Sequence, residues 1–235
     1  MTAKKNDLFD DLFIKQNMMG PSAIRIIEEI SKEIMITKGM RVLDLGCGKG
    51  LSSIYLAKNY DITLYATDLW ISATENYERF KAVMLDQKIV PIHADARNLP
   101  FANGYFDLVI SIDAYHYFGC EEGYLSTYLA PLIKRNGEIV IAVPGLKREF
   151  TNGVPEELKP FWQEDMNLHS CTWWENLWKK EKIVKITKCH ELHCFKEAWD
   201  DWLSCDNDYA RRDREMMKAE NGNYFNIVAI SGRIL

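Results

Sequence analysis

The chain has 235 residues, 47% of them hydrophobic, which is enough to bury a full core in a single domain. Acidic residues outnumber basic ones by 34 to 29, and the net charge of −5 argues against a nucleic-acid partner, whose phosphates require a basic surface. The first residues are polar, and no stretch approaches the roughly 18 apolar residues of a membrane span. We therefore expect a cytoplasmic protein with no membrane span.

Strands and helices alternate through the first 145 residues. Apolar residues recur at close to a 3.6-residue period over 24–35, and this predicts a first helix. Short apolar runs rich in β-branched residues then predict buried strands. These strands are expected over 40–45, 62–67, 88–94, 106–112 and 138–143, and the helices between them over 52–58, 71–85 and 122–133.

The composition changes after strand five, which Pro144 and Gly145 are expected to end. Residues 147–182 contain two prolines and four of the seven tryptophans, which predicts an irregular lid with an apolar wall. The pattern then predicts a strand over 183–190, helices over 196–203 and 210–220, and a closing strand over 224–231. Such alternation predicts an α/β fold with a Rossmann-like, doubly wound, seven-stranded and mostly parallel sheet and a lid insertion after strand five.

The most informative motif follows the first strand, where Asp44 precedes glycines at positions 46, 48 and 50. Glycine lacks a Cβ and tolerates positive φ, so this segment can turn tightly from strand to helix and approach a ligand closely. The turn is typical of a site for a nucleoside cofactor. Asp44 is expected beneath it, where its carboxylate can order the loop or accept a hydrogen bond from a bound cation. No Lys-Ser/Thr pair follows, so a phosphate-binding P-loop is not supported.

Four of the predicted strands end in or directly before an aspartate: Asp44, Asp68, Asp95 and Asp113. The carboxyl ends of parallel strands meet at one edge of the sheet, where ligands of open α/β folds bind. One aspartate alone is explained as a helix cap or a turn residue. Four on one rim indicate a binding site.

At this point the chain resembles the class I S-adenosylmethionine-dependent methyltransferases, in particular the small-molecule branch that includes the ubiquinone and menaquinone methyltransferases. The resemblance rests on VLDLGCGKG (42–50), YATDLW (65–70), HADARNLPF (93–101) and FDLVISIDAYHYF (106–118), and it covers roughly residues 38–145. It implies S-adenosyl-L-methionine as cofactor, S-adenosyl-L-homocysteine as product and methyl transfer to a small molecule. The acceptor atom is left open.

The resemblance also implies roles for individual residues. The glycine loop would line the methionine and ribose portions, Asp68 would accept from the ribose hydroxyls, and Asp95 with the Ala96 amide would read the adenine. Leu69 and Trp70 would flank the adenine, and the carbonyl of Asp113 or Ala114 would face the methionine amine. The cofactor-binding residues are thus expected to be Asp44, Gly46, Cys47, Gly48, Gly50, Asp68, Leu69, Asp95, Ala96 and Asp113.

The acceptor side is less well specified. Neither an Asn/Asp-Pro-Pro-Tyr/Phe motif nor a Pro-Cys pair is present, which argues against base amines and cytosine carbon as acceptors. His116 follows strand four and has an unperturbed pKa near neutrality, so it is the candidate general base, with a structural histidine as the alternative. We expect Met19, Tyr115, Tyr117 and Trp174 to contact the acceptor. Positioning alone also suffices for an in-line substitution, so a base is not required.

Two alternative functions remain open. One is a binding module or sensor without turnover, and the other is an NAD-dependent dehydrogenase. The dinucleotide fingerprint of the dehydrogenases requires its third glycine at position 51, whereas this chain has it at position 50. Six cysteines without framework spacing are expected to be reduced, and the cluster over 189–194 has metal-binding residue types. Neighbours in a strand point to opposite faces, so we expect no metal site there. The oligomeric state is not specified.

These readings divide one methyltransferase domain over 1–235 into three parts. They are an N-terminal arm and helix at 1–36, a cofactor-binding core at 38–145, and a lid with a variable C-terminal part at 147–222.

Overall fold

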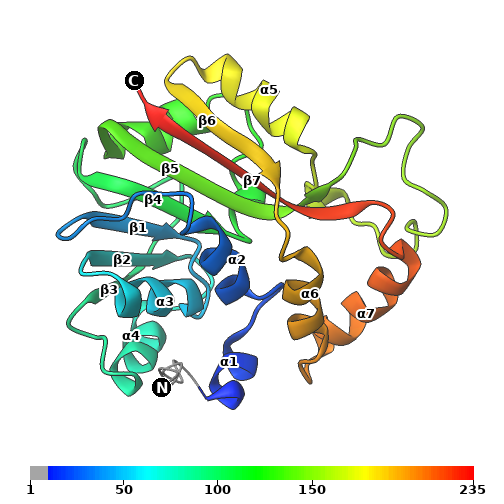
Figure 1. Cartoon of the computed structure of the whole chain (residues 1–235), viewed down its shortest axis with the longest axis horizontal. Coiled ribbons are helices and arrows are strands. Elements are labelled where there is room, and N and C mark those ends of the chain that lie inside the picture. Colours follow the sequence, from blue (N-terminus) through cyan, green and yellow to red (C-terminus); the bar gives the residue numbers. More distant parts are fainter. Residues whose placement is uncertain (1–9) are drawn as a thin grey trace, which may run out of the picture.

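A seven-stranded sheet forms the centre of the computed structural model (Figure 1), which describes residues 10–235 apart from the side chain of Glu164. The first nine residues of the predicted N-terminal arm lie outside the described residues. The strand order is β3-β2-β1-β4-β5-β7-β6. The strands are β1 (Arg41–Leu45), β2 (Thr63–Asp68), β3 (Ile89–His93), β4 (Phe106–Ile112), β5 (Ile133–Leu146), β6 (Val184–Glu191) and β7 (Phe225–Ile234).

The first five strands run parallel, and β7 is antiparallel to both β5 and β6. The order reverses between β1 and β4, which is where a doubly wound sheet opens a crevice for a ligand. The predicted fold class, with a mostly parallel seven-stranded sheet, is confirmed.

The helices are α1 (Asp11–Asn17), α2 (Ala23–Ile30), α3 (Leu51–Asn59), α4 (Ala73–Ala82), α5 (Cys171–Glu181), α6 (Phe195–Leu203) and α7 (Asp208–Glu220). Local sequence sets several of their starts. Ser72 and Glu75 form a reciprocal capping box at α4, and the Asn207 side chain accepts from the Ala210 N–H at α7. A 3₁₀ turn, η1 (Tyr115–Tyr117), follows β4, and another, η4 (Glu164–Met166), lies before α5.

Alternate side chains of the sheet enter two different cores. Val42 and Ile110 pack with the isoleucines of α2 and with α3, whereas Leu43 and Val109 pack with α5 and the turns that follow β4. This alternation is what a sheet covered on both faces requires. The cofactor-side edge is therefore held between two packed layers.

The predicted helix over 122–133 is wrong. A π-helical turn, η2 (Leu125–Leu129), and a 3₁₀ turn, η3 (Ala130–Leu132), occupy this segment, and β5 starts directly at Ile133. Pro131 has no N–H for a helical ladder, and the carbonyls of Pro131 and Leu132 instead accept from Gly104 and Tyr105 ahead of β4. These bonds tie the segment to the sheet.

Strand five does not end at Pro144 and Gly145 as predicted. It continues to Leu146, because Gly145 pairs with Asn226 and Leu146 pairs with Phe225 on the antiparallel neighbour β7. The missing proline N–H at 144 does not stop a strand whose other backbone groups are paired. The end of β5 consequently reaches over the ligand edge of the sheet.

The tryptophan-rich segment is only partly irregular. Ser170 caps α5 by accepting from the Trp173 N–H, and this helix buries Trp174 and Trp178 against the sheet beside β6 and β7. The lid predicted from composition therefore includes a core helix. Residues 147–170 form a long loop, which contains η4 and hydrogen-bonded turns such as that from the Leu158 N–H to the Pro155 carbonyl.

A third apolar cluster lies at the carboxyl ends of the strands. It joins Met18, Leu158, Trp199 and Trp202 and combines residues next to α1, from the 147–170 loop, and from α6 and α7. Figure 1 shows α7 and this loop beside the carboxyl end of β5 and the start of β7. Among residues 10–235, no helix is long and apolar enough to cross a membrane.

Candidate functional site

The glycine loop between β1 and α3 needs glycine for two reasons. Gly46 has φ 75°, and a Cβ there would lie 2.3 Å from the Ala114 Cβ, so no other residue fits without displacement. Gly50 has φ 81° and begins α3 against the ring of Phe80, where a Cβ would meet it at 2.4 Å. Gly50 does not line the cavity described below, in contrast to its predicted role.

Asp44 lies beneath this loop and is fully buried. Its Oδ2 accepts from the hydroxyls of Ser52 and Ser53, both at 2.6 Å, which ties the end of β1 to the first turn of α3. Burial raises its pKa to about 6, and Oδ1 has no hydrogen-bond partner. Asp44 therefore supports the loop from behind and does not line the cavity.

Asp68 organises two loops at once. Its Oδ2 accepts from the Gly48 N–H at 2.8 Å, and its Oδ1 accepts from the N–H groups of Trp70 at 2.7 Å and Ile71 at 2.9 Å. The carboxylate at the end of β2 thus fixes the glycine loop of β1 relative to its own following loop. One lone pair remains on Oδ2 and can accept from a ligand.

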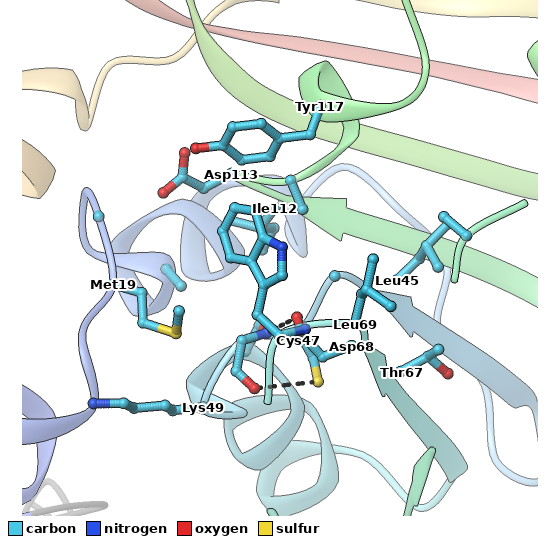
Figure 2. Close-up of a pocket in the computed structure, with 18 of the residues that line it drawn as sticks. Met19, Leu45, Cys47, Lys49, Thr67, Asp68, Leu69, Ile112, Asp113 and Tyr117 are labelled. Atoms are coloured by element: carbon cyan, nitrogen blue, oxygen red, sulfur yellow. Dashed lines mark hydrogen bonds between the residues drawn. The ribbon is translucent and has the colours of Figure 1, made fainter. Parts of the chain in front are cut away.

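A cavity of about 400 Å³, here called the first cavity, opens above these residues. Figure 2 shows Cys47 and Asp68 on one side of it and Asp113 and Tyr117 on the other. The structure brings together most of the predicted cofactor and acceptor residues in its lining: Gly46, Cys47, Gly48, Asp68, Leu69, Asp95, Ala96, Asp113, Met19 and Tyr117.

A second cavity of about 800 Å³ adjoins the first. Its wall comes from η1, the 147–170 loop, α6, α7 and the start of β7. The two cavities have part of their lining in common, so they meet at one junction. The shared residues are Met19, Gly20, Pro21, Trp70, Asp113, Tyr117 and Asp165.

Asp113 stands at this junction in a backbone conformation that non-glycine residues rarely adopt, with φ 52°. Burial of the carboxyl, with a smaller contribution from nearby Asp213, raises its pKa to about 8. A strained backbone and a displaced pKa in one cavity residue are typical of functional sites.

His116 lines the second cavity and not the first. It is 3% exposed, and its Nδ1 has no hydrogen-bond partner. Burial lowers its pKa to about 4, so the near-neutral pKa that made it the candidate general base does not hold in the folded protein. The imidazole is neutral at pH 7 and only weakly basic.

Two of the predicted acceptor contacts lie elsewhere. Tyr115 and Trp174 are fully buried in the core between the sheet and α5, with ring centroids 5.7 Å apart, and neither lines a cavity. The residue following Asp113 turns into η1, and this turn directs Tyr115 into the core while His116 and Tyr117 face the second cavity. The expectation that Tyr115 and Trp174 contact the acceptor is therefore corrected.

Sequence reasoning missed the contributions of α6, α7 and β7. The indole N–H of Trp202 donates to Asp213 Oδ2 at 2.8 Å, and burial raises the Asp213 pKa. Asn226 is 3% exposed with neither side-chain amide atom bonded. The sequence signal for Asn226 was a single amide within the apolar run of β7. Asp213 gave no such signal, because its charged neighbours are typical of a solvent-exposed helix face.

The cysteine and histidine cluster over 189–194 does not converge. The Cys189 thiol donates to the Cys171 carbonyl at 3.5 Å, His190 Nε2 lies 3.3 Å from Glu33, and the Cys194 N–H donates to Glu29. Within the described part of the chain, no group of three or more His, Cys, Asp or Glu side chains is arranged to hold a metal ion.

Residues 42–137 match a protein family described as a methyltransferase domain. The chain is 29% identical over 126 residues to the tRNA (carboxymethyluridine(34)-5-O)-methyltransferase alkbh8 of Xenopus tropicalis, covering 53% of this chain and 18% of that protein. It is 30% identical over 110 residues to norajmaline N-methyltransferase of Rauvolfia serpentina, covering 44% and 38%. The chain thus spans less than two fifths of the length of either relative.

The fold is similar to that of geranyl diphosphate C-methyltransferase from Streptomyces coelicolor A3(2), crystallised with S-adenosyl-L-homocysteine. The TM-score is 0.72 at 12% identity, with 91% of this chain and 79% of that chain covered. The segment that matches the family contains the glycine loop and the aspartates of β1 and β2. The chain is therefore similar to a methyltransferase domain over residues 42–137, and its fold is similar to that of a methyltransferase.

Proposed function

We propose that this chain transfers a methyl group from S-adenosyl-L-methionine to a small-molecule acceptor. The observation that carries this proposal is the pair of cavities, of about 400 and 800 Å³, that meet at Asp113 and Tyr117. The first lies at the reversal point of the sheet beside the glycine loop. The second is large enough for a small organic molecule.

The residues of the first cavity fit the cofactor. Asp68 Oδ2 retains one lone pair, which can accept from a hydroxyl of the ribose diol. Asp95 Oδ1 accepts from the Arg97 N–H, and its other oxygen remains for the adenine amine. The Lys49 ammonium donates to the Gln16 carbonyl at 3.0 Å. A sulfonium cofactor has no phosphate and therefore needs no basic side chain to bind one.

The cofactor supplies an electrophilic methyl group, so the protein's task is to position the acceptor and exclude water. An acceptor in the second cavity would approach through the junction, with Tyr117 and Met19 beside it. We propose that the neutral His116 orients the acceptor through Nδ1. Its predicted role as general base is less well supported, because Asp113 has the higher pKa and stands closer to the junction.

The acceptor itself must be inferred from this chain. The proteins compared above are named for transfer to oxygen, nitrogen and carbon, so they do not indicate one atom. One of them acts on tRNA, but the net charge of −5 and the acidic second cavity favour a small molecule here. A cytoplasmic location without a nucleic-acid partner remains a proposal.

We further propose that the 147–170 loop and the segment around Met19 close over the bound molecules. Both line the second cavity, and both pack in the apolar cluster at the strand ends. The cofactor-binding core would then be 38–145, and the covering part would come from the arm, the loop, α6 and α7.

Calorimetry with S-adenosyl-L-homocysteine tests the first half of the proposal, because this product binds without turnover. Saturable binding that is absent with NAD supports it, and binding of NAD alone overturns it. Release of S-adenosyl-L-homocysteine in the presence of an acceptor distinguishes the enzyme from a binding module, which would bind the cofactor and show no acceptor-dependent release.

A further inference from the structure

We propose that the acceptor is an amine, which enters the second cavity as a cation and is methylated on nitrogen. This inference rests on the proposed methyl transfer and specifies its substrate class. Three independent features of the second cavity carry it: its charge, its aromatic wall and its unpartnered buried polar groups.

The lining of the cavity is acidic. Its lining includes the carboxyls of Asp113, Asp165, Asp213 and Glu215, against one exposed guanidinium, Arg212, at the same helix α7. Arg211 of α7 pairs with Asp206 and Asp208 outside the cavity, whereas Lys218 pairs with the cavity residue Glu215. The cavity carboxyls that form no ion pair within residues 10–235 are therefore those of Asp113, Asp165 and Asp213.

Three of these acids converge on the junction. Burial raises the pKa of the Tyr117 hydroxyl, and the charges of Asp113, Asp165 and Asp213 raise it further. The carboxyls come from the end of β4, the 147–170 loop and α7, so three separate elements place acidic groups around one hydroxyl. Such convergence favours a cation and disfavours a carboxylate or phosphate ligand.

The wall of the cavity is aromatic. Trp70 and Tyr117 contact each other with centroids 5.1 Å apart, yet they remain 64% and 49% exposed, so their surfaces are available to a ligand. Aromatic faces attract ammonium groups through the ring quadrupole. The aromatic lining comprises Trp70, Tyr117, Phe161, Trp162, Trp199, Trp202, Tyr209 and Phe225.

Two buried polar side chains in this lining have no protein partner. Asn226 is 3% exposed, and both its Oδ1 and its Nδ2 lack a hydrogen bond; His116 Nδ1 lacks one too. Buried polar groups are nearly always hydrogen-bonded, so an unpaired amide facing a cavity indicates a ligand group. In this proposal the Asn226 amide hydrogen-bonds to a polar substituent of the amine, and the carboxyls contact its charged nitrogen.

The same residues suit the chemistry. Burial raises the pKa of the Asp113 carboxyl to about 8 in the unliganded protein, and a cation bound beside it favours the ionised form. The ammonium then gives one proton to this carboxylate, and the freed nitrogen lone pair forms a bond to the methyl carbon. The carbon–sulfur bond breaks with its electron pair left on sulfur. The positive charge of the sulfonium is thereby transferred to nitrogen, so the product is again an ammonium, which the acidic cavity stabilises.

The test uses amine and alcohol pairs of matched shape: butylamine and butanol, phenethylamine and 2-phenylethanol, and tryptamine and tryptophol. Each is added to the protein with S-adenosylmethionine, and release of S-adenosylhomocysteine is measured. We expect at least one amine to exceed its alcohol by about tenfold or more, the scale of a desolvated cation–carboxylate and cation–π contact. An alcohol that matches or exceeds its amine in every pair, or no response to any amine, overturns the proposal.

Two variants sharpen this result. Asp213→Asn keeps an oxygen for the Trp202 indole but removes the charge, and we expect it to reduce the amine preference while binding S-adenosylhomocysteine normally. Asp208→Asn, a matched change at an exposed residue of α7 outside both cavities, should leave the preference intact. If S-adenosylhomocysteine fails to bind, the proposed function fails; if it binds and no amine is preferred, only this inference fails.

Discussion

Gly20 leaves the space that the carboxylate of Asp113 occupies: a Cβ at Gly20 would lie 2.0 Å from Asp113 Oδ2. The segment leading into α2 therefore packs directly on the residue at which the two cavities meet. Because the chain carries no side chain at this contact, Asp113 can remain beside the junction while the arm covers it.

We expect Gly20→Ala to displace either Asp113 or the arm, because the added methyl group overlaps a carboxylate oxygen. Overpacking of this kind costs about 1–3 kcal/mol of stability. Calorimetry should show weaker binding of S-adenosylhomocysteine. Gly39→Ala is the control. Gly39 has φ 81°, and a Cβ added there would have no neighbouring atom within 4 Å. This variant is strained but makes no clash, so it should bind S-adenosylhomocysteine as the wild type does. Equal binding in both variants would contradict the prediction.

Asp68→Ala should weaken S-adenosylhomocysteine binding by about 1.5–3 kcal/mol, the contribution of hydrogen bonds to a charged group. The substitution also leaves the N–H groups of Gly48, Trp70 and Ile71 without their acceptor, so both loops lose order. Asp61→Ala, at an exposed ion pair with Lys38, provides the comparison and should bind normally. Undiminished affinity in Asp68→Ala would remove this carboxylate from the cofactor site.

Asp113 should make the unliganded protein less stable as the pH rises. Its folded pKa is raised from 3.8 to about 8, so its stabilising contribution is complete below pH 4 and is lost as pH rises through about 8. Thermal melts of the wild type and Asp113→Asn should therefore diverge between pH 4 and 8 in favour of the variant. Asp44 and His116 titrate in both proteins and cancel in the difference. Parallel melting curves would show that Asp113 ionises normally.

Local sequence was sufficient to predict the half of the site formed by strand ends. β4 was predicted residue for residue, and the glycine loop with Asp68 was recognisable, because strand ends of a parallel sheet must share an edge. The second cavity was not predictable in the same way. Its walls come from segments far apart in sequence, and whether the Asp213 side chain meets solvent or Trp202 depends on how α7 packs.

Burial also changes the properties of residues that the sequence pointed to. His116 was chosen for its ordinary pKa, but that value belongs to a solvated imidazole, and enclosure beneath the 147–170 loop lowers it to about 4. Trp174 and Trp178 lie in a segment whose composition predicts an irregular lid, whereas α5 packs both of them into the core. Such outcomes depend on tertiary packing, which periodicity does not encode.

Hydrogen exchange should reveal whether the covering segments close. On addition of S-adenosylhomocysteine we expect greater protection in residues 147–170 and around Met19, in addition to the glycine loop, because both segments line the cavities. The buried helix α5 is the internal reference and should not change. Protection confined to residues 44–114 would mean that no lid closes on the cofactor.

The role of His116 can be determined by comparing two substitutions. If the neutral imidazole orients the acceptor, His116→Gln should retain more activity than His116→Ala, with a raised KM and an unchanged pH profile, since glutamine also offers a donor and an acceptor. A general base would behave differently: both variants would lose about 10²- to 10⁴-fold in turnover, and glutamine would not restore it. A thermal melt must accompany the kinetics, because the ring is buried. Since burial lowers its pKa to about 4, we expect the first result, with the pH dependence following Asp113.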